Sequence, residues 1–158
     1  MAAVFIVMLA LMAGAAAYNR AFDQERLKRA HEHYLLGRTL ADYGYYDRAI
    51  DQFSDALIYQ RDNFDYRLGL ALALFHGKRY QEAEYQLLEL RSQQPTDATA
   101  NRLLARLAAR GGRFSQAANY YRTAIYGRWP RNTEQNRLAT RFELVDLLSS
   151  GMAAQRKS

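Results

Sequence analysis

A period of 34 residues runs through the middle of this 158-residue chain and constrains its fold more than any other feature. When the sequence is shifted against itself by 34 positions, small residues align with small ones and bulky apolar residues with bulky apolar ones. The apolar positions recur three and four residues apart, which predicts amphipathic helices rather than strands. A fixed period of this length is typical of a stack of similar helical units. The aligned sets are Leu36, Leu70 and Leu104; Gly37, Ala71 and Ala105; Leu40, Leu74 and Ala108; Ala49, Ala83 and Ala117; Phe53, Leu87 and Tyr121; and Ala56, Leu90 and Ala124.

Each unit is predicted to be a pair of helices that touch through small residues. In the first unit, residues 30–42 form the first helix and residues 46–61 form the second. Gly37 and Ala49 are small enough for the two helix axes to approach closely, and Phe53 fills the space above them. This pattern resembles the tetratricopeptide repeat (TPR) family, whose consensus carries small residues where two helices touch and large apolar residues beside them.

The resemblance implies an all-α fold that contains three TPR-type helical hairpins. The repeats are predicted at residues 30–63, 64–97 and 98–131, and residues 132–158 are predicted to be a capping helix and a tail. A terminal helix of this kind covers the apolar end of a helical stack. Residues 19–29, which precede the repeats, contain neither proline nor glycine and are predicted to form a stiff helical stalk.

The N-terminal segment is apolar on every side. Residues 1–17 carry no charged side chain, and a helix that ends one residue later is about 27 Å long. We therefore predict that residues 1–18 form an N-terminal transmembrane helix, which serves as an anchor. The alternative is a cleaved signal segment, because the three alanines at 15–17 fit a small-residue cleavage site. The nearest basic residues, from Arg20 onward, all follow the segment, so the positive-inside rule favours a single-pass anchor with a cytoplasmic repeat domain.

No residue pattern for catalysis, cofactor binding or metal binding is visible. The chain has no cysteine, which excludes disulfides, thiolate zinc sites and cysteine nucleophiles. His31 and His33 are two positions apart on a predicted helix, unlike the i, i+4 pair that chelates zinc. No serine lies in a strained Gly-x-Ser-x-Gly turn. The sequence therefore predicts a protein that is not an enzyme and that binds no cofactor and no metal.

Positive charge is concentrated in the C-terminal part of the chain. The formal net charge is +6, and residues 98–158 hold eleven Lys and Arg against three Asp and Glu. Arg102, Arg106 and Arg110 recur every four residues and so share one helical face. This stripe predicts contact with an acidic partner, and the alternative is an ordinary solvated arginine face. Nucleic-acid binding is disfavoured, because no aromatic and basic motif and no recognised reader fold accompanies the charge.

The resemblance also implies a concave surface, formed by the first helix of each unit, on which a partner segment binds. The surface is apolar in its middle and basic toward the C-terminal unit, which suits an extended or helical segment with acidic residues. Some members of the family bind the carboxyl terminus of a chaperone through Lys and Asn at fixed positions of this surface. That ligand is not supported here, because those places hold Tyr34, Arg38, Gly69, Thr99 and Leu103. The predicted partner-binding groove consists of Tyr34, Arg38, Leu68, Leu72, Phe75, Arg102, Arg106 and Arg110.

A second candidate contact lies at the edge of the stack. Arg128, Trp129 and Arg131 flank Pro130, and Trp and Arg are frequent interface anchors. The alternative is that Trp129 packs under the terminal helix.

Together these features predict a membrane-anchored TPR protein that binds a protein partner as a scaffold, adaptor or assembly factor. An anchor raises the effective concentration of a weak binding groove near membrane-associated partners. The alternative is a structural or accessory subunit that is permanently embedded in a larger membrane complex, which then covers the open end of the stack.

Overall fold

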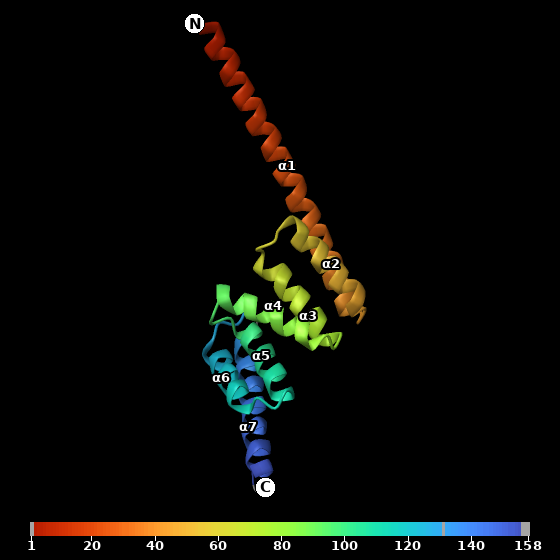
Figure 1. Ribbon diagram of the computed structural model, residues 1–158, viewed down its shortest axis with the longest axis vertical. Helices are drawn as coiled ribbons and strands as arrows, with labels where there is room; N and C mark the ends of the chain where they lie inside the picture. Colours follow the sequence, from red (N-terminus) through yellow and green to blue (C-terminus); the bar gives the residue numbers. More distant parts are fainter. Residues whose placement is uncertain (1, 131, 156–158) are drawn as a thin grey trace. The chain divides into compact units, whose positions relative to one another are not determined.

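Seven α-helices and no β-sheet make up the part of the chain that the computed structural model describes, residues 2–130 and 132–155. The all-α architecture that the repeat predicts is therefore confirmed (Figure 1). The helices are α1 (Ala2–Asp42), α2 (Tyr46–Tyr59), α3 (Phe64–His76), α4 (Tyr80–Gln93), α5 (Ala98–Arg110), α6 (Phe114–Tyr126) and α7 (Thr133–Gln155). They divide into two compact units, with the boundary between Gly69 and Leu70 inside α3.

In the first unit, α1 packs along α2 around one buried ring. Phe53 on α2 lies directly against two glycines: a Cβ atom at Gly37 would stand 3.0 Å from the ring, and one at Gly69 only 2.6 Å. The backbones of α1 and α3 therefore reach the ring only because neither position carries a side chain. Gly44 adopts a positive φ of 80°, which makes the turn from α1 into α2.

In the second unit, α5 lies between α4 and α6, and α7 packs against α6 (Figure 1). Alanines make the close contacts, and the three that the period aligns, Ala49 in the first unit and Ala83 and Ala117 in the second, are all fully buried. α5 begins at a capped N-terminus, because the Asp97 carboxylate accepts a hydrogen bond of 2.8 Å from the Ala100 backbone N–H.

The terminal helix α7 departs from the burial pattern of the repeat. A shift of 34 residues equates Leu138 and Phe142 with Leu104 and Ala108 of α5, which are buried. In α7 these two side chains are instead 52% and 66% exposed, and Thr140 is buried in their place. The helix therefore covers the stack with a side that the register does not predict.

The N-terminal helix overturns one prediction. α1 is continuous from Ala2 to Asp42, but no helix in the described part of the chain is both long enough and apolar enough to span a membrane. The predicted transmembrane helix at residues 1–18 is therefore wrong, and so is the single-pass membrane localisation with cytoplasmic repeats that rested on it. The physical reason is that a spanning helix needs about 20 predominantly apolar residues, whereas α1 carries polar and charged side chains from Asn19 onward.

Candidate partner-binding site

The eight residues predicted to form a partner-binding groove are divided between the two units. In each unit they include at least one arginine and partly exposed apolar side chains on the first helix of a hairpin. The first unit holds Tyr34, Arg38 and Leu68, and the second holds Leu72, Phe75, Arg102, Arg106 and Arg110.

In the first unit, Tyr34 is part of an aromatic cluster. Its ring stacks on Tyr66 with 4.8 Å between the ring centres and lies 5.9 Å from the ring of Phe53. Arg38 is one turn further along α1, and its guanidinium carbon lies 5.8 Å from the centre of the Tyr34 ring. Arg38 is exposed and makes no ion pair with any residue in the described part of the chain. Its charge is therefore accessible to an external anion.

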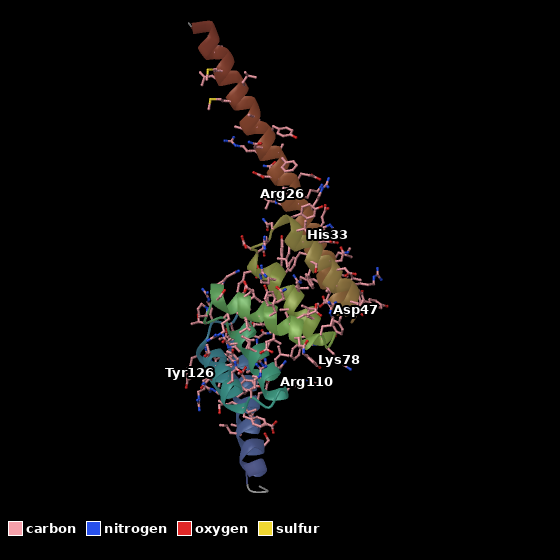
Figure 2. All side chains as sticks on the ribbon, in the orientation of Figure 1. Arg26, His33, Asp47, Lys78, Arg110 and Tyr126 are labelled. Atoms are coloured by element: carbon pink, nitrogen blue, oxygen red, sulfur yellow. The ribbon has the colours of Figure 1, made fainter. Side chains whose placement is uncertain are left out.

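His33 holds α1 against α2. Its Nδ1 atom lies 2.9 Å from Gln52 Oε1, and its ring stacks on Tyr59 at 5.9 Å between centres (Figure 2). The carboxylate of Asp55 is 3.8 Å away. This histidine is thus engaged in helix packing.

In the second unit, Arg102 and Arg106 converge on one carboxylate, that of Glu143 on α7. Arg106 forms a bidentate fork, with Nε 3.0 Å from Oε2 and Nη2 2.7 Å from Oε1. Arg102 donates to Oε1 from Nε at 3.0 Å and also from Nη2. Because both guanidinium groups are hydrogen-bonded to the α7 carboxylate, these two arginines hold the terminal helix in place.

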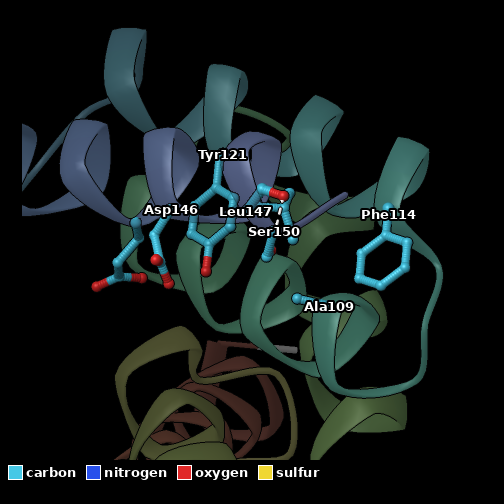
Figure 3. Close-up of a pocket in the computed structure, with 7 residues that line it drawn as sticks. Ala109, Phe114, Tyr121, Asp146, Leu147 and Ser150 are labelled. Atoms are coloured by element: carbon cyan, nitrogen blue, oxygen red, sulfur yellow. Dashed lines mark hydrogen bonds between the residues drawn. The ribbon is translucent and has the colours of Figure 1, made fainter. Parts of the chain in front are cut away.

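The surroundings of Glu143 shift two pKa values strongly. Burial raises the pKa of the Glu143 carboxyl, but the hydrogen bonds and charges of Arg106 and Arg102 outweigh burial and lower it to about 2. Burial, together with the Glu143 charge and a hydrogen bond to it, raises the pKa of Tyr121 to about 12. Tyr121, Glu143 and Leu147 line a shallow pocket of about 240 Å³ between α6 and α7 (Figure 3). Glu143 is therefore ionised, and Tyr121 neutral, over the whole ordinary pH range.

Arg110, the last residue of α5, is in a different environment (Figure 2). Its guanidinium carbon lies 4.4 Å from the centre of the Tyr80 ring. The Tyr80 ring in turn meets Phe75 edge to face, at 5.9 Å between centres. Arg110 is exposed, and across the described residues it has no ion-pair partner. A charge held over an aromatic ring, next to apolar surface, is thus presented outward.

The predicted edge contact is only partly accessible. Trp129 is buried at 8% exposure, where it packs on Ala98 of α5 and Ala124 of α6, and the Arg102 guanidinium carbon lies 5.9 Å from its ring. Arg128 is exposed and donates a hydrogen bond of 3.2 Å to the side chain of Gln94. Arg131 lies outside the described residues. Of the edge residues described, only Arg128 can meet a partner without a rearrangement of the core.

Glu143 is the residue that the sequence analysis missed. It is one of only three acidic residues in the basic segment 98–158, and an isolated carboxylate among so many arginines is a signal for a structural ion pair. The period alone could not reveal it, because Glu143 lies on α7, where the register is lost.

A family model for the tetratricopeptide repeat matches residues 34–98 and 86–133. The chain belongs to the tetratricopeptide repeat family. The two matches together span more than half of the chain, and they begin in α1 and end at the start of α7. Among curated proteins, no match to the sequence was found.

Solved structures of other TPR proteins share the fold. PcrH in complex with the chaperone-binding region of PopD has a TM-score of 0.70 at 16% identity, over 77% of this chain and 92% of that chain. The first TPR domain of human RPAP3 has a TM-score of 0.68 at 19% identity, over 82% and 97%. The first TPR of Spaghetti (RPAP3) bound to the HSP90 peptide SRMEEVD has a TM-score of 0.67 at 19% identity, over 80% and 98%. At sequence identities of 16% to 19%, the similarity between these structures and this chain is a similarity of fold.

Proposed function

We propose that this TPR protein binds a partner protein as a scaffold or adaptor, through an acidic segment of the partner that contacts the first helices of its hairpins. The observation that carries the proposal is the cluster formed by Phe75, Tyr80 and Arg110 in the second unit. It combines an accessible positive charge with adjoining apolar and aromatic surface.

The stacking of Arg110 on Tyr80 prepares it for a carboxylate. An arginine that lies over a ring loses less conformational freedom when it binds an anion, and the edge of its guanidinium still offers N–H donors. Leu72 and Phe75, one turn apart on α3, are only partly buried and supply apolar contact beside the charge. An amphipathic or extended segment with at least one Asp or Glu satisfies both features.

The three arginines of the α5 stripe have separate roles in this proposal. Arg102 and Arg106 already hold Glu143, so they stabilise α7 and are not assigned to the partner. Arg110 in the second unit and Arg38 in the first are exposed and stacked on tyrosines, so they are assigned to contact with the partner. The bidentate fork of Arg106 on Glu143 illustrates how an arginine on this fold receives a carboxylate.

The solved structures of similar proteins support a protein segment as the class of ligand, but they do not identify that segment. PcrH is described with a segment of PopD, and Spaghetti with an acidic HSP90 peptide. The places at which some relatives use Lys and Asn to grip a chaperone carboxyl terminus hold other residues here, so the proposed ligand is an internal acidic segment.

Site-specific photocrosslinking identifies the partner and tests the surface. A benzophenone amino acid in place of Phe75 is expected to capture the partner in cells, whereas the same group in place of Leu88 on α4 is not. The purified partner is then titrated calorimetrically against the wild type, Arg110→Glu and the matched control Arg122→Glu, an exposed arginine on α6. We expect Arg110→Glu to weaken binding about tenfold or more, with Arg122→Glu unchanged. Equal affinities of all three proteins contradict the proposal.

A permanent subunit of a larger complex is the second candidate. It is favoured by the apolar side chains that α7 exposes, among them Phe142 and Val145. Light scattering on the chain made alone separates the two functions. A dissociable adaptor is monodisperse, whereas a subunit that depends on its complex aggregates.

A further inference from the structure

The turn between α3 and α4 contains a lysine where two equivalent turns contain glycine. A shift of 34 residues equates Gly44, Lys78 and Gly112. All three adopt a positive φ, of 80°, 64° and 72° in that order. Glycine adopts this left-handed conformation at little cost, whereas a side chain brings its Cβ atom too close to the backbone. The backbone at Lys78 is therefore strained for a residue of this type.

Backbone hydrogen bonds impose this conformation on Lys78. Its N–H donates to the Phe75 carbonyl oxygen at 3.2 Å, and the N–H of Arg79 donates to the Leu74 carbonyl oxygen at 2.9 Å. The turn around Gly112 repeats both bonds, at 3.0 and 2.8 Å. A residue at this place adopts a positive φ in order to close the turn. The lysine therefore lowers the stability of the fold relative to glycine.

The side chain of Lys78 does not stabilise the fold through a polar contact. It is exposed, and it makes no hydrogen bond and no ion pair with any residue in the ranges 2–130 and 132–155. It instead lines a shallow pocket of about 420 Å³ together with Tyr80 of α4. Strained residues cluster at binding sites, where the side chain acts on a ligand. The geometry at Lys78 therefore indicates a role outside the fold.

The acidic side chains near Tyr80 are already paired with arginines. Residues 78–84 and 110–113 carry four basic and two acidic side chains, a local net charge of +2. The two ion pairs, at 2.6 and 2.7 Å, are Arg79 with Glu82 and Arg113 with Glu84. The two basic residues that remain are Lys78 and Arg110.

Lys78 and Arg110 both lie next to Tyr80. The Arg110 guanidinium carbon is 4.4 Å from the centre of the Tyr80 ring, and Lys78 lines the pocket beside the same residue (Figure 2). Both basic side chains are exposed, and neither forms an ion pair with a described residue. Two accessible positive charges therefore adjoin the aromatic surface that the proposed function assigns to the partner.

We propose that Lys78 is a second anchor for the partner, so that the partner's acidic segment carries two acidic residues, one for Arg110 and one for Lys78. This inference rests on the proposed function and specifies its ligand. Arg110 can bind a carboxylate through two N–H groups, whereas Lys78 offers a single charge on a flexible stem. A segment with one acidic residue satisfies only one of the two cations. Lys78 thus sets the preference for a second acidic residue.

Lys78→Gly tests the strain. We expect it to raise the midpoint of thermal unfolding by about 2–4 °C, because it introduces the residue that the two equivalent turns contain. The fluorescence of Trp129 reports on the second unit. Lys78→Arg keeps both the charge and the strain and is expected to leave the midpoint unchanged. A midpoint that does not rise in Lys78→Gly shows that the lysine serves the fold, for example at the negative end of the α3 dipole, and overturns the inference.

The ligand preference is measured with a library of ten-residue peptides. The peptides are randomised among Ala, Leu, Phe, Ser, Gln and Glu, and both ends are capped so that no terminal carboxylate contributes. They are passed over immobilised full-length protein, and mass spectrometry identifies the retained peptides. The wild type and Lys78→Arg are expected to enrich peptides with two glutamates about threefold or more over peptides with one. Lys78→Gly is expected to lose this preference but still to enrich one glutamate over none.

The matched control is Arg122→Gln, which removes one exposed positive charge from α6 and is expected to keep the wild-type preference. An equal loss in this control and in Lys78→Gly assigns the preference to general charge and overturns the inference. The role of Lys78 is also refuted, while the proposed function stands, if the wild type gains nothing from a second glutamate or if Lys78→Gly keeps the preference for two. A wild type with no preference for glutamate at all contradicts the proposed function, and the inference fails with it.

Discussion

Replacement of Glu143 by glutamine tests the ion-pair cluster that holds α7 on the second unit. The substitution keeps the size of the side chain and removes its charge. Arg102 and Arg106 then face a neutral amide in place of a carboxylate that accepts four hydrogen bonds from them. Both arginines are partly buried, so neither recovers full hydration in the variant.

The expected magnitude follows from the pKa of Glu143. Its ordinary value of 4.5 is lowered to about 2 by the two arginines, against the opposing effect of burial. At about 1.4 kcal/mol per pKa unit, the shift sets an upper limit of roughly 3.5 kcal/mol on the differential stabilisation. Because a quarter of the Glu143 side chain is exposed and glutamine retains part of the hydrogen bonding, we expect a loss of about 2 kcal/mol.

The lowered pKa of Glu143 fixes the direction in which its stabilising effect changes with pH. A carboxyl whose pKa is lowered on folding stabilises the native state above its unfolded pKa, and the stabilisation is lost as the pH falls toward the folded pKa. The difference in unfolding free energy between the wild type and Glu143→Gln is therefore largest near neutral pH. It falls by roughly half or more between pH 6 and pH 3.

Trp129 provides the assay, because it is the only tryptophan and lies buried beside Arg102. Urea unfolding followed by its fluorescence at pH 7 and pH 3 reports on the second unit. The matched control is Glu134→Gln on the same helix, since Glu134 is highly exposed and pairs with Arg137 one turn away. We expect the control to cost no more than about 0.5 kcal/mol. Equal losses for the two variants, or a Glu143→Gln loss that is the same at pH 7 and pH 3, refute this account.

Two further predictions concern the packing around Phe53 and the titration of Tyr121. Gly69→Ala is expected to destabilise the first unit by about 1–3 kcal/mol in thermal unfolding, because the new Cβ would stand 2.6 Å from the Phe53 ring; Gly14→Ala, with no atom within 4 Å, is the control and should cost nothing. Burial and Glu143 raise the pKa of Tyr121 to about 12, so the wild type is expected to lose stability between pH 10 and pH 12. Tyr121→Phe should lose less over that range in urea unfolding, and parallel losses in the two proteins would count against the buried phenol.

The helices and their close contacts followed from local sequence. The period placed Gly37 and Ala49 at the contact of the first hairpin, and the structure has Phe53 packed on Gly37 and Ala49 fully buried. Such positions are predictable because residues three and four apart share a helix side, and a small residue allows close approach whatever lies elsewhere in the chain. The N-terminal prediction failed for the opposite reason. It relied on the absence of charge over residues 1–17 and gave too little weight to the polar and charged residues that follow in the same helix.

The candidate site was harder to predict, because the pairing and burial of its side chains depend on contacts with residues that are distant in the sequence. Spacing on α5 placed Arg102 and Arg106 on one face, but the residue that forms ion pairs with them, Glu143, is 41 and 37 residues away. The burial of Trp129 likewise depends on how Ala98 and Ala124 approach each other. Neither pairing leaves a periodic signal.

Periodicity and residue size were enough to specify a stack of helical hairpins, since both act within one or two helical turns. Which arginines remain accessible to a partner was decided by the packing of α7. The packing of α7 brings one carboxylate onto Arg102 and Arg106 and leaves Leu138 and Phe142 exposed, whereas Arg110 stacks on Tyr80. The burial pattern of a terminal helix depends on contacts with residues that are distant in sequence, and in the described part of the chain no helix beyond α7 covers its outer side.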